Sequence, residues 1–325
     1  MHHAFFMRRC LTLAEEGRGK VGNGAFVGAV LVRDGDIIAE GVHRGFGLLH
    51  AERDLLEQFS GSIEPTDTLY VNLEPCCHMG KTPPCTEIIL KRGVKHLVYG
   101  LRDPDRRVSG QGIEFLRLNG VEVIGPVLRD ECAWMNRGFI SVREKGRPWI
   151  TLKSARAADG SIAHPDGSPK RITSKEQDAW SHEFLRAKHD AILVGVNTII
   201  KDDPSLTVRS INVPVQPWRI VFDPHARTPL HASIIKKNPE RTILVVDAAL
   251  DLSCTEPYLE REIHIWRIPC IQNMFDFHAL FQGCITSQEN FCGITSILVE
   301  GGERTWHPFW SHHHVDMDVL LPGSS

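Results

Sequence analysis

Short apolar runs rich in β-branched residues alternate with segments of helical spacing, and this alternation restricts the fold more than any other feature of the chain. Asp34-Gly35 joins two of these runs and predicts a β-hairpin with a tight turn. Through residue 145 the pattern predicts further strands at 68–75, 94–101 and 121–126, and helices at 50–59, 84–92, 111–119 and 130–142. Strands and helices in this order are typical of a three-layer α/β sandwich.

The alternation restarts after residues 143–148, a charged segment with Gly and Pro that is the best candidate for a linker. Beyond it we expect a helix at 174–188 and strands at 149–155, 191–199, 218–224, 242–247, 263–269 and 296–302. The remainder of 249–290 has no pattern clear enough to place elements. The sequence therefore predicts two α/β domains, residues 1–145 and 146–325.

The composition excludes several classes of protein. The net charge of −3 gives no overall attraction to nucleic acid or to an anionic membrane. No apolar run approaches the roughly 20 residues that span a bilayer, and the N-terminal segment is typical of an amphipathic helix rather than a signal peptide. Nine cysteines without an export signal indicate a reducing compartment, where clustered cysteines bind metal more often than they pair. We therefore expect a cytoplasmic enzyme with a small-molecule substrate; a homo-oligomer is compatible with these features.

Two short segments carry residues suited to a catalytic zinc site, His50-Ala51-Glu52 and the run from Pro75 to Cys85. A catalytic zinc ion needs three protein ligands and one open position for water. His50, Cys76 and Cys85 supply one imidazole and two thiolates. Glu52, two residues from a ligand, is placed to carry protons between the water and the substrate without binding the metal.

Each part of this motif also has a non-catalytic interpretation. A His-x-Glu triplet occurs by chance in many proteins, and a Cys-Cys-His run can consist of buried thiols beside a surface histidine. Cys77 and His78 also compete as ligands by proximity, although adjacent residues rarely reach the same metal. Together and in this order, the segments resemble the zinc deaminase signature.

Eight residues separate Cys76 from Cys85, and this long spacing, in the run CCHMGKTPPC, resembles the bifunctional deaminase/reductase family of riboflavin biosynthesis. The resemblance extends over nearly the whole chain. Its other matching segments are Arg102-Asp103-Pro104-Asp105, Gly110-Gln111-Gly112-Ile113, Thr151-Leu152-Lys153, Asp159-Gly160, Ile172-Thr173-Ser174, Ile192-Leu193-Val194-Gly195, 198–209 and Val299-Glu300-Gly301-Gly302.

The resemblance implies two successive reactions. An N-terminal domain with the cytidine-deaminase fold would use zinc to deaminate a diaminohydroxypyrimidine that carries a phosphoribosylamino group. A C-terminal domain with a fold similar to dihydrofolate reductase would use NADPH to reduce the ribosyl group to a ribityl chain. The implied residues of this second domain are, for the cofactor, Thr198, Asp202 and Gly302, and, for the substrate, Arg186, Leu206, Arg209 and Glu300.

Elementary chemistry agrees with part of this assignment. Gly301 and Gly302 end a predicted strand and open a helix, where main-chain amides can approach a cofactor phosphate. Arg186 and Arg209 could hold a substrate phosphate through charge-assisted hydrogen bonds. Taken singly, a two-glycine turn is more often a plain connection, and an isolated arginine is more often solvated.

The sequence also departs from the family pattern. Gly24-Ala25 replace an Asn-Pro pair of the first hairpin, with Asn23 one position away. In the second domain the departures are Arg156, Pro169 and Arg171, and the sequence ends at Ser325, before further family strands that would complete the sheet. These departures leave a second interpretation open, in which the chain is a deaminase only and its NADPH-dependent step is weak or absent.

Two other classes of protein share part of the pattern. A nucleic-acid-editing deaminase would use the same zinc chemistry, but it should carry a basic surface and a base-flipping pocket. A non-catalytic protein with a structural zinc would not need Glu52, which argues against this class for the first domain and leaves it open for the second. The run His312-His313-His314 is most simply an exposed segment.

Overall fold

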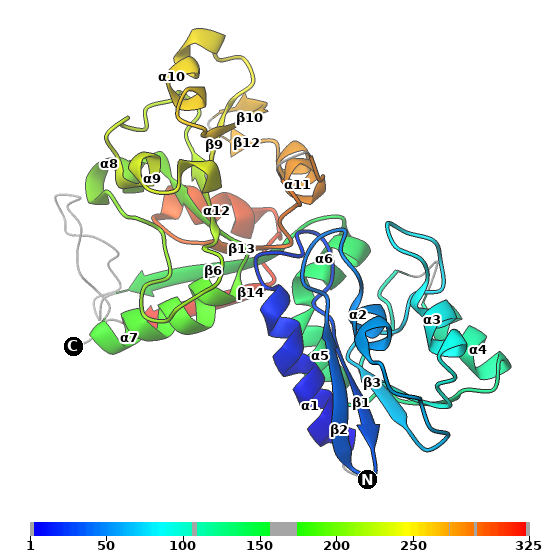
Figure 1. Ribbon diagram of the computed structural model, residues 1–325. Coiled ribbons are helices and arrows are strands. Elements are labelled where there is room, and N and C mark those ends of the chain that lie inside the picture. The colour runs from blue at the N-terminus through cyan, green and yellow to red at the C-terminus, as the bar shows by residue number, and fades with distance from the viewer. Residues whose placement is uncertain (1–2, 106–108, 157–173, 273, 289–290, 323–325) are drawn as a thin grey trace. The chain divides into compact units, whose positions relative to one another are not determined.

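The computed structural model describes residues 3–105, 109–156, 174–272, 274–288 and 291–322, and the chain divides into two compact units (Figure 1). The first unit comprises Met1–Gly146 together with Ser287–Cys292, and the second comprises Arg147–Thr286 and Gly293–Ser325. No described helix is both long enough and apolar enough to cross a lipid bilayer.

A five-stranded sheet forms the centre of the first unit, with the strand order β2-β1-β3-β4-β5. β1 pairs antiparallel with both β2 and β3, whereas β3, β4 and β5 are parallel. The predicted hairpin is confirmed, because Asp34 and Gly35 adopt positive φ angles of 50° and 93° between β1 and β2. The strands are β1 (Gly28–Arg33), β2 (Asp36–Val42), β3 (Thr68–Val71), β4 (His96–Tyr99) and β5 (Glu122–Ile124).

Helices cover both faces of this sheet, as two glycines show. A Cβ at Gly28 of β1 would lie 2.2 Å from the carbonyl oxygen of Cys10 in α1, and a Cβ at Gly41 of β2 would lie 2.2 Å from that of Ala51 in α2. Because Gly41 pairs with Ala29, the neighbour of Gly28, the two glycines face opposite sides of the sheet. The three-layer arrangement is thus confirmed. The helices are α1 (His3–Ala14), α2 (Ala51–Gln58), α3 (Cys85–Lys91), α4 (Gln111–Leu118), α5 (Arg129–Met135) and α6 (Arg137–Lys145).

The prediction of a single helix at 130–142 is wrong, since α5 and α6 are separate helices that meet at Asn136. The fully buried Asn136 side chain accepts a hydrogen bond from the main-chain N–H of Phe26 (2.8 Å) and donates one to its carbonyl (3.0 Å). This tertiary contact interrupts the helix. α6 also extends to Lys145, inside the expected linker, and ends at Gly146 with a φ of +66°.

A seven-stranded parallel sheet forms the centre of the second unit, with the order β10-β9-β8-β7-β13-β6-β14. A parallel sheet whose strands alternate with helices along the chain confirms the predicted α/β class. Its strands are β6 (Trp149–Arg156), β7 (Ala191–Gly195), β8 (Trp218–Phe222), β9 (Thr242–Asp247), β10 (His264–Ile268), β13 (Ser296–Val299) and β14 (Met317–Pro322), and a separate ribbon pairs β11 (Cys270–Ile271) with β12 (Met274–Phe275).

The helices of the second unit differ from the prediction in two places. The strand expected at 191–199 ends at Gly195, where a helix begins, and the helix expected at 174–188 continues after Trp180 as a π-helical turn over Ser181–Leu185 and a 3-10 turn over Arg186–Lys188. The α-helices are α7 (Lys175–Trp180), α8 (Val196–Asp202), α9 (Ser233–Lys236), α10 (Glu256–Leu259), α11 (Phe277–Ile285) and α12 (Glu303–Ser311).

Candidate active sites

Three potential metal ligands meet at the starts of two helices of the first unit. His50 immediately precedes α2, Cys85 is the first residue of α3, and Cys76 lies in the loop that follows β3. The Nδ1 atom of His50 lies 3.5 Å from the Sγ atoms of both cysteines. Zn–N and Zn–S bonds in a tetrahedral site would separate a nitrogen from a sulfur by about 3.5 Å. Both nitrogen–sulfur separations therefore fit a tetrahedral zinc ion.

The local fold explains why these residues converge. Ala51, Leu55 and Leu56 of α2 are buried against the sheet, which fixes the helix start and therefore His50. The N–H of Cys85, at the start of α3, donates to Sγ of Cys76 (3.3 Å). A main-chain donor at a helix start stabilises a thiolate.

The cluster has the electrostatics of a thiolate site with a neighbouring acid. Hydrogen bonds with the side chains of Cys85 and His50 lower the pKa of Cys76 to about 4. Burial raises the pKa of Glu52 to about 7, and this side chain is only 3% exposed. Glu52 lies outside the group of ligand atoms, which all fall within 4.8 Å of one another. An acid that holds and releases a proton near neutral pH is thus placed beside the metal position.

A cavity of about 460 Å³ opens over this cluster, lined in part by His50, Glu52 and Cys76. Asn23 and the Gly24-Ala25 departure also line it, so an asparagine is present in the pocket despite the altered hairpin. A volume of this size suits one small aromatic ring with substituents.

A second cavity, of about 1140 Å³, lies at the carboxyl ends of β6, β7, β8 and β13 in the second unit. Ligands of parallel α/β sheets bind at this edge. Gly301 has a φ of +102°, and a Cβ there would lie 3.1 Å from Oγ1 of Thr198. The cavity is larger than a typical small-ligand site, and its glycine turn leaves main-chain amides open to a phosphate, so the residues fit a dinucleotide together with a substrate.

A buried ion pair borders the second cavity. Arg186 donates to both carboxylate oxygens of Glu300, at 2.6 and 3.1 Å, and to the carbonyl of Thr207 at 3.2 Å. Side-chain exposures of 13% and 8% show that the pair is largely removed from water. The guanidinium of Arg186 is therefore engaged with protein atoms, and its first effect is to orient Glu300.

Comparison with known proteins relates both units to one family. The model of the RibD C-terminal domain matches residues 148–321, and that of the cytidine and deoxycytidylate deaminase zinc-binding region matches residues 1–101. The riboflavin biosynthesis protein RibD of Aquifex aeolicus is 43% identical over 316 residues, which cover 97% of this chain and 85% of that protein. This chain belongs to the RibD family.

Solved RibD structures share the fold of this chain. RibD of Acinetobacter baumannii superposes with a TM-score of 0.81 at 30% identity, covering 99% of this chain and 87% of that one. A protein of Thermotoga maritima, described as a diaminohydroxyphosphoribosylaminopyrimidine deaminase/5-amino-6-(5-phosphoribosylamino)uracil reductase, gives 0.80 at 35% identity, covering 98% and 85%. The chain is thus a bifunctional deaminase and reductase of riboflavin biosynthesis with Zn²⁺ and NADPH as cofactors.

The RibD match bears on the alternative in which the chain is a deaminase only. Pro169 and Arg171 lie outside the described residues, as does the side chain of Arg156. Because the RibD C-terminal domain model spans 148–321 and includes all three positions, the match favours the bifunctional interpretation.

The structure brings together most residues that the sequence assigned to the RibD reductase site. Arg209 is the exception, since it does not line the cavity; its main-chain N–H donates to Nδ1 of His182 (3.1 Å). The assigned residues that do line the cavity are Thr198, Asp202, Gly302, Arg186, Leu206 and Glu300.

Sequence reasoning missed several residues of the RibD deaminase pocket, of which His43 is the clearest. Its ring lies 5.3 Å from that of His50, and its Nδ1 pairs with the carbonyl of Leu49 (2.9 Å), which leaves Nε2 near Gly24. The available signal was its position directly after β2, because that strand leads to the loop that carries His50.

Proposed function

We propose that the first unit deaminates a diaminohydroxypyrimidine bearing a phosphoribosylamino group, and that the second unit then reduces the ribosyl group of the product with NADPH. One observation carries this proposal, namely that His50, Cys76 and Cys85 converge at zinc-binding distances beside the buried Glu52. The described activity of the Thermotoga maritima relative supports the choice of substrate.

Glu52 would perform the proton transfers of the first reaction. Zinc, when bound by His50, Cys76 and Cys85, lowers the pKa of a bound water to about 7. The Glu52 carboxylate takes a proton from the attacking water, passes it to the ring nitrogen, and later assists protonation of the departing amine. The C–O bond forms first, as the ring nitrogen takes the first proton. The C–N bond breaks afterwards, when Glu52 has passed the remaining hydroxyl proton to the amine, so that a C=O bond forms and ammonia leaves.

Cationic side chains in the same pocket would hold the substrate phosphate. Lys81 and Arg143 both line the cavity. The Lys81 ammonium lies 3.4 Å from the ring centroid of Phe46, which also lines the pocket and orients that charge. Charge-assisted hydrogen bonds from such groups would distinguish a phosphorylated pyrimidine from a free base.

The second reaction would take place in the larger cavity. NADPH, when bound, supplies the hydride. Thr198, Asp202 and Gly302 line the cavity on the side of the glycine turn, where they would contact the cofactor. Glu300, which Arg186 holds in place, and Lys153 both line this cavity and carry opposite charges. The carboxylate would accept hydrogen bonds from the hydroxyl groups of an opened ribose, and the ammonium would donate one to its carbonyl group.

We expect one zinc ion per chain in the wild type and less than about one tenth of that in Cys85→Ser, because a hydroxyl is a poor substitute for a thiolate ligand. Cys77→Ser is the matched control, since Cys77 lies outside the ligand group and should leave the zinc content unchanged. Metal analysis of the purified proteins measures both. Full zinc occupancy in Cys85→Ser would remove Cys85 from the ligand set.

The two reactions should occur in a fixed order. With the diaminopyrimidine phosphate as substrate, we expect ammonia release both with and without NADPH, and a fall in NADPH absorbance only after ammonia appears. Turnover on the order of 1 s⁻¹ or faster would be ordinary for an enzyme. Ammonia release with constant NADPH absorbance would support the deaminase-only alternative instead.

A further inference from the structure

A second buried acid, Glu74, lies beside the deaminase pocket and is bound entirely differently from Glu52. It follows β3, is 5% exposed, and borders the cavity two residues before Cys76. One carboxylate oxygen accepts hydrogen bonds from the N–H groups of Asp103 (3.0 Å) and Gly110 (2.9 Å). The other accepts from Gly112 (3.0 Å) and Ile113 (3.3 Å).

These four contacts assign Glu74 to the main chain rather than to the substrate. Gly112 and Ile113 belong to the first turn of α4, whose N–H groups have no partner within the helix. Glu74 supplies that partner from another part of the chain, and it also binds the main-chain N–H groups of Asp103 and Gly110. A carboxylate whose two oxygens are both engaged in this way is poorly placed to transfer protons.

The loop that Glu74 holds carries two other acids of the pocket wall. Asp103 and Asp105 both line the cavity, and the N–H of Asp105 donates to Oδ1 of Asp103 (2.8 Å). Carboxylate oxygens on the wall can accept hydrogen bonds from the donors of an aminopyrimidine or from ribosyl hydroxyl groups. Their position depends on the segment that Glu74 anchors.

A close backbone contact also links the start of α4 to the chain next to the metal ligand Cys76. A Cβ at Gly112 would lie 2.0 Å from the carbonyl oxygen of Pro75, between Glu74 and the metal ligand Cys76. The start of α4 is therefore pressed directly against the chain that carries the ligand. Displacing α4 would move the acidic wall relative to the metal position.

We propose that Glu74 is a positioning residue of the deaminase, which acts through Asp103 and Asp105 to hold the substrate-binding wall in place. The proposal rests on the deaminase function proposed above. Glu74 touches neither substrate nor metal in this role. Its removal should therefore weaken substrate binding rather than the chemical step.

Glu74→Gln tests the proposal, because the amide turns an NH₂ group toward main-chain donors. We expect KM for the diaminopyrimidine phosphate to rise about 10- to 100-fold, comparable to the loss of one or two hydrogen bonds to a charged group. We expect kcat to stay within about threefold of wild type, with one zinc per chain. Combining Glu74→Gln with Asp103→Asn should raise KM no further than the larger single effect.

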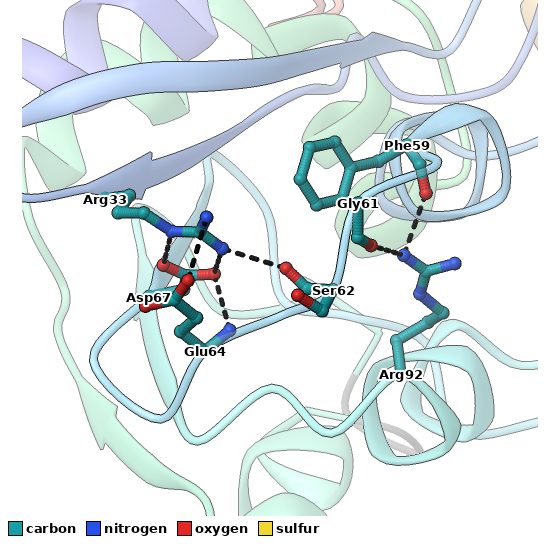
Figure 2. A network of polar contacts seen from close by, with 7 residues as sticks. All are labelled: Arg33, Phe59, Gly61, Ser62, Glu64, Asp67 and Arg92. Carbon is teal, nitrogen blue, oxygen red and sulfur yellow. Dashed lines mark hydrogen bonds and ion pairs between the residues drawn. The ribbon is translucent and has the colours of Figure 1, made fainter.

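Asp67→Asn is the matched control. Asp67 is a fully buried carboxylate of the same unit that accepts hydrogen bonds from Arg33 (2.8 Å) and from the N–H of Glu64 (2.8 Å), as Figure 2 shows. It does not line the pocket. This variant should lose stability with an unchanged KM.

The outcomes separate the competing roles of Glu74. A fall in kcat with an unchanged KM would overturn the proposal and make Glu74 a proton carrier, and a loss of stability with a normal KM would make it merely structural. Should Glu74→Gln fail to fold, Glu74→Asp keeps the charge but draws the carboxylate back from the same main-chain N–H groups, and it must give the same rise in KM. Absence of ammonia release from the wild type would instead contradict the deaminase function itself.

Discussion

Replacing Glu52 by glutamine is expected to reduce ammonia release by at least about 10²–10⁴-fold, the usual contribution of a general acid/base, and to leave one zinc ion per chain. The amide has nearly the shape of the carboxylate but cannot accept and return a proton. Glu52 lies outside the ligand group, so the metal position should be preserved. Steady-state ammonia release and metal analysis on the same preparation measure the two effects.

Glu57→Gln is the matched control for this experiment. Glu57 lies on the same helix, is exposed, and pairs with Arg53 at 2.7 Å. Its replacement should change neither activity nor zinc content. Near-normal ammonia release by Glu52→Gln would show that another group carries the protons.

Glu300→Gln is expected to lower the free energy of unfolding by about 3–5 kcal/mol at pH 7, because it leaves the buried guanidinium of Arg186 without its counter-charge. Burial alone would raise the pKa of Glu300, but the charges of Arg186 and Lys153 outweigh burial and hold this pKa at about 2. A carboxyl whose pKa is lowered by folding stabilises the protein above its ordinary pKa, and this contribution is lost as the pH falls through about 2. The difference between wild type and variant should therefore shrink below about pH 4.5.

Denaturant unfolding at pH 7 and at pH 3 measures this difference. Glu260→Gln, which removes an exposed ion pair with Arg261 (3.9 Å), is the control and should cost at most about 1 kcal/mol. An equal effect of the two substitutions at pH 7 would contradict a buried, stabilising pair.

Features that depend on a local sequence motif could be predicted from the sequence. The Asp34-Gly35 turn follows from residues that favour positive φ angles, and the grouping of His50, Cys76 and Cys85 follows from a spacing that suits one chemistry. The turn needs no information from distant parts of the chain, whereas the three ligands, up to 35 residues apart, were grouped because their motif resembles the zinc deaminase signature.

Other features depend on partners far away in the sequence and could not be predicted from it. Asn136 interrupts a helix because it binds the main chain of Phe26, 110 residues away. Arg186 was assigned to a substrate phosphate, yet each of its three side-chain nitrogens donates a hydrogen bond to Glu300 or Thr207. Glu74 likewise gave no sign in the sequence that its partners would be the main-chain N–H groups of another loop.

The contact between Gly41 and α2 has a consequence for the engineering of metal selectivity. The absence of a side chain at this position sets the separation between the sheet and the helix that His50 precedes. Enlarging residue 41 would shift α2, and with it the imidazole of His50, relative to Cys76 in the loop after β3. Substitutions at this one backbone contact would thus change the distances between the three donor atoms, and so the preferred coordination geometry, without replacing any ligand.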